Sequence, residues 1–150
     1  MVKTKPVSAN KLVLRVLDAN WNRAREGLRV CEEVARFVLE DAALTRQLQR
    51  ARYTLDRAVI SQLHVADLFA ARNVRSDPGR PALRPHAGNH RRYRDLACAN
   101  IRRTEEALRV MEEFSRISFP RAARSFAALR FKSYDLEQTL FRRLSSLSGS

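Results

Sequence analysis

Three polar residues recur with the same spacing in two distant parts of the chain. The two sets are Asn20, Arg23 and Glu26, and Asn100, Arg103 and Glu106. Arginine binds phosphate oxygens through paired hydrogen bonds, an amide can orient such an arginine, and a carboxylate can hold an arginine or a divalent metal ion. Residues of these types could together line a polar, ligand-binding cavity.

Both sets lie in an internal repeat with an offset of 80 residues. Residues 19–36 and 99–116 are identical at ten of eighteen positions without a gap. A second, weaker region of similarity follows each copy, at an offset of 81 residues. The chain is therefore expected to contain two copies of one helical unit, over about 10–71 and 90–146.

Apolar residues alternate at spacings of four and three along most of the chain, and this pattern predicts packed helices. Most prolines and glycines fall in residues 72–89, which predicts a central loop. We expect one all-α domain over residues 1–150, an up-and-down four-helix bundle made of two duplicated antiparallel hairpins. The expected helices span residues 10–40, 42–71, 90–118 and 120–146, with a break near His64 as an open alternative for the second.

The recurring arginines fall in an unusual place on a helical wheel. Asn20 and Arg23 lie within the apolar arc of the first helix, and Glu26 lies at its rim. An arginine directed into a core is costly unless it is paired, so the repeat predicts a polar, ligand-binding cavity between the hairpins. The alternative is that the arginine and glutamate of each set pair with one another and only fix the helix register. Four further pairs are expected on solvated outer faces: Arg29–Glu33, Glu32–Arg36, Arg109–Glu113 and Glu112–Arg116.

Two other groups of residues could contribute to such a site. One is a stripe on the last helix, which faces either the same cavity or the edge of the core as a hydrogen-bonded trio. The other is in the central loop, where arginines beside a tight turn suit phosphate and an aspartate suits Mg²⁺. The stripe is Arg130, Tyr134 and Glu137, and the loop offers Arg72, Asp77 and Gly79.

Composition narrows the classes of partner and location. The chain has 29 Lys and Arg against 16 Asp and Glu, a net charge of +13, so anionic partners are expected. Two cysteines and three scattered histidines exclude a disulfide framework and a zinc site. There is no glycine-rich phosphate loop, transmembrane stretch or signal peptide, so we expect a cytoplasmic protein without a membrane partner.

The two long repeated runs carry a resemblance to a known family. They read LDANWNRAREGLRVCEEVARF and ANIRRTEEALRVMEEF. The chain resembles, over residues from about 14 to 141, the helical domain that some bacteria fuse to the N-terminus of thiamine-phosphate synthase. That domain is described as a hydroxymethylpyrimidine phosphate kinase. Because no synthase barrel follows Ser150, the stand-alone form is expected.

The resemblance implies a reaction and a set of roles. ATP would phosphorylate 4-amino-5-hydroxymethyl-2-methylpyrimidine phosphate to the diphosphate, with Mg²⁺ as the metal, held by Asp77. Arg23 and Arg103 would contact phosphates, the two asparagines would orient the ligand, and the two glutamates would hold the arginines or metal. Arg72 and Asp77 would close over the phosphates. In this loop the family reads approximately R-D-T-x-x-D-x-G.

The chain departs from that loop pattern at two positions, which favours a second function. Asn73 stands for the acid and Val74 for the hydroxyl, so if that acid binds metal or that hydroxyl holds phosphate, the activity would be weakened or altered. The second function is a catalytically silent domain that docks on thiamine-phosphate synthase. A nucleic-acid-binding helical module is a further alternative, but acids interleave with the arginines and no helix-turn-helix signature or aromatic platform is present. A second copy of the chain is kept as an alternative partner.

Overall fold

The computed structural model describes residues 9–79 and 90–147, and every regular element in these ranges is helical. This confirms the expected all-α class. The second predicted helix is interrupted after Gln62, so the alternative of a helix break near His64 is confirmed. The elements are α1 (Ala9–Glu33), a π-helical turn η1 (Val34–Val38), α2 (Ala42–Gln62), α3 (Val65–Ala71), α4 (Tyr93–Ser118) and α5 (Pro120–Leu147).

Local chemistry explains where the first hairpin turns. The backbone N–H of Leu39 donates to the carbonyl of Val34 at 3.0 Å, five residues back, which widens the end of the first helix. Glu40 then adopts a φ of 50°, and the Asp41 carboxylate accepts a hydrogen bond from the N–H of Leu44 at 2.9 Å. An aspartate in this role is a favoured N-cap, so α2 begins at once and returns antiparallel to α1.

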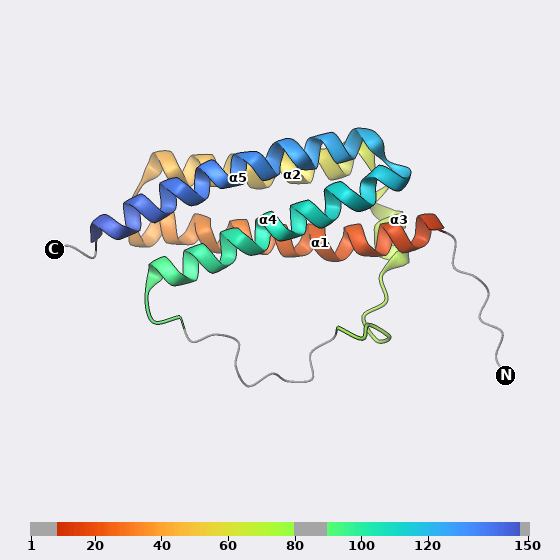
Figure 1. Cartoon of the computed structure of the whole chain (residues 1–150), viewed down its shortest axis with the longest axis horizontal. Coiled ribbons are helices and arrows are strands. Elements are labelled where there is room, and N and C mark those ends of the chain that lie inside the picture. Colours follow the sequence, from red (N-terminus) through yellow and green to blue (C-terminus); the bar gives the residue numbers. More distant parts are fainter. Residues whose placement is uncertain (1–8, 80–89, 148–150) are drawn as a thin grey trace.

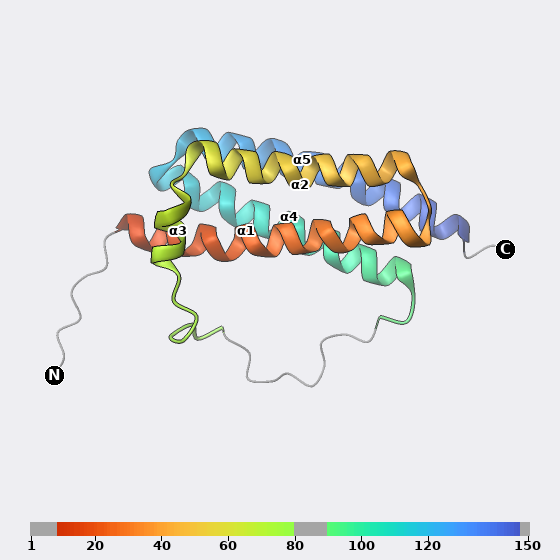
Figure 2. The same ribbon diagram turned by 180° about the vertical axis from the view of Figure 1, so that it is seen from behind.

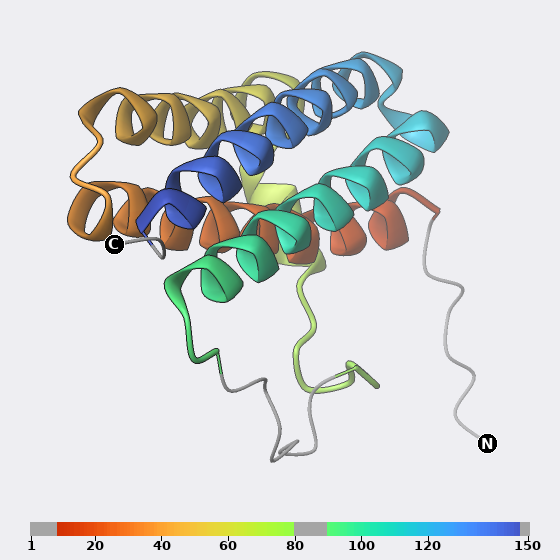
Figure 3. The ribbon, with the colours of Figure 1, turned by 60° about the vertical axis from the view of Figure 1, so that its left-hand side comes forward.

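The four long helices form a bundle in which neighbours run in opposite directions. α1 and α4 lie side by side on one side of the bundle, and α2 and α5 lie on the other (Figures 1 and 3). Each repeat thus contributes one antiparallel hairpin, as expected. α3 ends at one end of the bundle and α4 begins at the other, so α2 and α4 run in the same direction (Figure 2). This corrects the expected up-and-down order, in which consecutive long helices would alternate in direction and α4 would run parallel to α1.

The core is built from the inward faces of all four long helices. Trp21 and Cys31 are buried in it, as their positions in the first helix predicted. Burial raises the pKa of the Cys31 thiol to about 12, which makes this cysteine a structural residue. The largest fully buried side chains include Leu17, Leu28, Leu48, Leu55, Ile101, Leu108, Met111, Phe126, Leu136 and Leu140. Burying a side chain of this size contributes about 1.5–3 kcal/mol.

Gly27 sets how closely α1 approaches α4. A Cβ atom at Gly27 would lie 2.6 Å from the backbone oxygen of Asn100 and closer still to the Thr104 hydroxyl. That hydroxyl lies 3.3 Å from the Ala24 carbonyl oxygen and 3.1 Å from that of Asn100. A glycine is therefore required at this contact, and the close contact places the two repeated polar sets next to each other.

Candidate anion-binding site between α1 and α4

A pocket of about 440 Å³ lies between α1 and α4. Both repeated sets line it, so the structure brings together all six residues that the sequence singled out. Sequence reasoning missed the remaining three lining residues, although a glycine within a helical pattern is a signal of close packing. The pocket is lined by Asn20, Arg23, Glu26, Gly27, Asn100, Arg103, Glu106, Ala107 and Val110.

The duplication explains why equivalent residues meet. α1 and α4 have closely similar sequences and run antiparallel in direct contact, so equivalent positions lie around a pseudo-two-fold axis between them. Gly27 and Ala107 are equivalent, as are Arg23 and Arg103, and each pair lines the same pocket. A helix-packing contact between two copies thus produces a site with two arginines.

The location of this pocket differs from the expectation in one respect. Arg23 and Arg103 are exposed, so the pocket opens to solvent on the outside of the bundle. The wheel was misleading because the apolar arc of α1 combines two faces. Leu17 and Leu28 are fully buried, whereas Phe37, at the edge of the same arc, is 64% exposed. The arginines lie on the outward part of this arc.

The two asparagines form the buried wall of the pocket, with exposed fractions of 5% for Asn20 and 8% for Asn100. Each side-chain amide donates to the carbonyl four residues earlier, at 2.9 Å, to Val16 and Leu96 respectively. These hydrogen bonds fix both side chains. The oxygen of Asn20 lies 3.5 Å from the Arg23 guanidinium, which is consistent with an orienting role.

The four charged residues of the pocket have no ion-pair partner within the part of the chain that the structure describes. In particular, Arg23 does not pair with Glu26, nor Arg103 with Glu106, so the alternative of self-satisfied structural pairs is wrong. Most other glutamates of α1 and α4 are paired, as the neighbouring Glu33 and Glu113 show. Two unpaired guanidinium groups beside each other are suited to bind a ligand with two or more negative charges.

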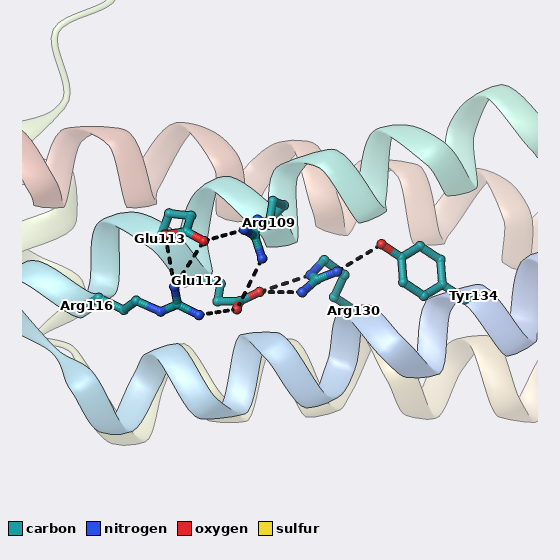
Figure 4. A network of polar contacts seen from close by, with 6 residues as sticks. All are labelled: Arg109, Glu112, Glu113, Arg116, Arg130 and Tyr134. Carbon is teal, nitrogen blue, oxygen red and sulfur yellow. Dashed lines mark hydrogen bonds and ion pairs between the residues drawn. The ribbon is translucent and has the colours of Figure 1, made fainter.

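Glu112 corrects the expectation that the outer pairs are solvated. It is only 3% exposed, and its carboxylate accepts from Arg130 of α5 at 2.8 and 3.0 Å and from Arg116 at 2.7 Å (Figure 4). The sequence could not show this, because Arg130 reaches Glu112 from another helix. Glu113 and Arg109 do form the expected surface pair.

Glu32, the equivalent residue of the first copy, is buried in the same way. Its carboxylate accepts from Arg52 of α2 at 2.9 Å and from Arg29 at 3.2 Å. The expected pair with Arg36 does not form. The helix widens to a π-turn at Val34–Val38, and Arg36 lies instead over the Phe37 ring at 4.7 Å.

The loop residues lie apart from the pocket. Arg72 forms a two-point ion pair with the buried Asp18, with distances of 2.7 and 2.8 Å. Asp77 is exposed and accepts from the backbone N–H of Gly79 at 2.8 Å, which forms the tight turn. The structure therefore does not bring this group to the arginines, and the roles proposed for it stay predictions. The rest of the loop, residues 80–89, lies outside the described residues.

The stripe on α5 also faces elsewhere. Arg130 donates to the Tyr134 hydroxyl at 2.9 Å as well as to Glu112, and Glu137 accepts from Arg102 at 2.9 Å. These contacts join α4 to α5, whereas the pocket lies between α1 and α4. The stripe thus lies apart from the pocket, as the second alternative expected, but it is not a hydrogen-bonded trio, because Glu137 bonds to Arg102 and not to Arg130 or Tyr134.

Glu105 is a buried carboxyl group that the sequence did not single out. One of its oxygens is buried without a hydrogen-bond partner in the described residues. Burial, and then the nearby Glu137 carboxylate, raise the pKa of Glu105 to about 7. In the first copy the equivalent positions hold Arg25 and Asp56, an ion pair at 2.8 Å. The second copy has thus replaced an ion pair by two carboxyl groups.

Glu105 should make the stability of the fold depend on pH. The unfolded chain ionises it near the ordinary pKa of 4.5, while the folded chain keeps it protonated up to about pH 7. The free energy of unfolding should therefore fall, by on the order of 3 kcal/mol, as the pH rises through this window. Chemical denaturation across the window measures this. Glu105→Gln should flatten the profile and the exposed Glu40→Gln should not; equal profiles for both variants would contradict the assignment.

Comparison with known proteins shows which family the sequence of this chain matches. The sequence model of the ThiD2 family matches residues 15–139. A thiamine-phosphate synthase of Thermosynechococcus vestitus is 40% identical over 140 residues, which are 93% of this chain and 38% of that protein. One of Nostoc punctiforme is 39% identical over 130 residues, 87% of this chain and 36% of that protein. The chain thus spans less than two fifths of these relatives.

No solved structure matches the chain significantly. Within residues 9–79 and 90–147, none of the helices has a stretch long and apolar enough to span a lipid bilayer.

Proposed function

Because the chain belongs to the ThiD2 family, and thereby to thiamine biosynthesis, we propose that it is a phosphomethylpyrimidine kinase. In this proposal ATP phosphorylates 4-amino-5-hydroxymethyl-2-methylpyrimidine phosphate to its diphosphate. The observation that carries the proposal is the pair of unpaired arginines, Arg23 and Arg103, in one pocket beside two buried asparagines. The synthase activity named for the longer relatives is not proposed for this helical chain.

The chemistry of the reaction suits a site without an obvious base. The attacking group is a phosphate oxygen, which is already ionised near neutral pH, so no proton has to be removed from it. The oxygen attacks the γ-phosphorus of ATP, and the bond to the β-phosphate oxygen breaks with release of ADP. Catalysis then depends on positioning two polyanions and neutralising their charge. Arg23 and Arg103 would supply that neutralisation, and Asn20 and Asn100 would orient the substrate.

The pocket also fits the Mg²⁺ that such a reaction uses. Mg²⁺ is commonly held by one or two protein carboxylates, completed by phosphate oxygens and water. Glu26 and Glu106 offer two carboxylates without partners, and the described residues contain no cluster of three or more candidate ligands. These two residues would therefore hold the ion, which supplies further charge neutralisation at the phosphates. Asp77 is not brought to this pocket.

A coupled assay for ADP release tests the proposal. Purified chain is incubated with Mg²⁺, ATP and hydroxymethylpyrimidine phosphate, and formation of the diphosphate is checked by mass spectrometry. We expect turnover that requires all three additions. Absence of turnover, together with unchanged phosphopyrimidine binding in Arg23→Ala, would refute both the reaction and the site.

A specific observation favours a second candidate, the silent domain that docks on thiamine-phosphate synthase. Asn73 and Val74 interrupt the expected loop pattern, and the Asn73 backbone oxygen accepts from Arg15, which gives the loop a structural contact. This candidate predicts binding to a synthase without ATP consumption. The expected cytoplasmic location, and a second copy of the chain as partner, stay predictions.

A further inference from the structure

A second cavity is a groove lined by residues of α2 and α5. These two helices lie across the bundle from α1 and α4, which line the first pocket (Figure 3). Its volume is about 720 Å³, within the range of sites for small ligands. One end is closed by a hydrogen bond across the two helices, from the Gln62 amide to the Ser125 hydroxyl at 2.9 Å.

The charge of this groove has one sign. Arg50, Arg57 and Lys132 line it, and no carboxylate does. None of these three cations has an ion pair or hydrogen bond in the part of the chain that the structure describes. This arrangement contrasts with the α1–α4 pocket, where two carboxylates accompany the arginines. The α2–α5 groove is therefore suited to an anion that needs no metal ion to offset acidic neighbours.

The floor of the groove is apolar. Ala51 and Leu129, each 5% exposed, lie at its base, and Ala58 and Ala128 continue the surface along the two helices. Small side chains leave room for a planar group to lie on the helices, while the hydroxyls of Thr54 and Ser61 offer hydrogen bonds. The groove thus combines an apolar platform with a cationic rim.

We propose that the α2–α5 groove is a second ligand site, for an anion that carries phosphate groups on an aromatic ring system, the chemistry of a nucleotide. The ring would lie on the alanine floor and the phosphates would bind Arg50, Arg57 and Lys132. The two cavities open on opposite sides of the bundle, so a ligand here cannot react with one in the α1–α4 pocket of the same chain. The site is therefore independent of the proposed kinase reaction.

Isothermal titration with ATP tests this site, with inorganic triphosphate as a probe for phosphates alone. The measurement uses the full chain carrying Arg23→Gln and Arg103→Gln, which removes any contribution from the α1–α4 pocket. We expect ATP to bind this variant at one site and more tightly than triphosphate. Adding Arg50→Gln and Arg57→Gln should weaken ATP binding at least about tenfold, because each lost charge-assisted hydrogen bond is worth roughly that factor.

A matched control removes the same charge elsewhere. Arg46→Gln and Arg124→Gln lie on the same two helices but do not line the groove, and they should leave ATP binding unchanged. Equal effects of the two double variants would overturn the proposal, since binding would then follow net charge alone. Equal affinity for ATP and triphosphate would overturn the proposal that the aromatic ring lies on the apolar floor of the groove. If the unchanged chain showed no turnover while ATP still bound the groove, only the proposed function would be refuted.

Discussion

Replacing both Arg23 and Arg103 by glutamine should lower the affinity for hydroxymethylpyrimidine phosphate about 100-fold or more and abolish detectable turnover. Both side chains line one pocket and neither has an ion-pair partner in the described residues. A hydrogen bond to a charged group is worth about 1.5–3 kcal/mol, so two of them account for this loss. Single variants should each lose part of it, because equivalent residues flank one ligand. Titration calorimetry and the ADP-release assay measure the two effects.

The fold should be indifferent to this change, and that gives the control. Both arginines are exposed, so the free energy of unfolding of the double variant should match that of the unchanged chain. Arg46→Gln with Arg124→Gln removes the same charge outside the pocket and should leave affinity and turnover intact. If this control pair lowered affinity as much as the pocket pair, the ligand would be responding to overall charge, and the site would be misplaced.

Glu112→Gln should be the most destabilising conservative change in α4, with a loss of about 3–5 kcal/mol in the free energy of unfolding. The carboxylate is 4% exposed and accepts from Arg130, itself 11% exposed, and from Arg116 (Figure 4). Removing its charge leaves the partly buried Arg130 guanidinium without a counter-charge, which is costlier than loss of the attraction alone. Urea denaturation followed by circular dichroism measures the change.

The neighbouring residue provides a matched control for Glu112. Glu113 also contacts Arg109 and Arg116, but its side chain is 40% exposed, so Glu113→Gln should cost less than about 1 kcal/mol. Combining Glu112→Gln with Arg130→Gln should recover part of the loss, because the unpaired cation is gone. Similar losses for Glu112→Gln and Glu113→Gln would show that burial does not govern the energetics of this network.

Most of the fold could be predicted because the helices depend on local patterns. The apolar spacing, and Pro120 as the first residue of α5, place the starts of all four long helices within a few residues of the observed ones. The first two were predicted to end too late, at residues 40 and 71, whereas α1 ends at Glu33 and α2 at Gln62. The break between α2 and α3 was left open, since a short interruption of the pattern near His64 does not distinguish a kink from a break. The π-turn at Val34–Val38 was missed, because the preceding residues continue the α-helical spacing without a proline or glycine.

The candidate site also has a part that the sequence predicted and a part that depended on the tertiary structure. The duplication predicted one polar cavity for Arg23 and Arg103, but only the tertiary structure decided that α1 and α4 pack antiparallel, which brings equivalent residues together at the crossing. The contacts of the other polar residues depend on partners far away in the chain. Asp18 engages Arg72, and Glu112 engages Arg130; neither pair has a sequence spacing that could have predicted it.

The chain has a large excess of arginine, and the repeat singled out Arg23 and Arg103 as the candidates for one polar cavity. A helical wheel orders residues around an axis but does not show which neighbour covers each sector. Only the packing of α2 and α5 against α1 and α4 decided that Arg23 and Arg103 open to solvent and remain unpaired. The same packing buried Glu32 and Glu112 beneath arginines from α2 and α5, because the burial and pairing of a charge depend on which helices surround it.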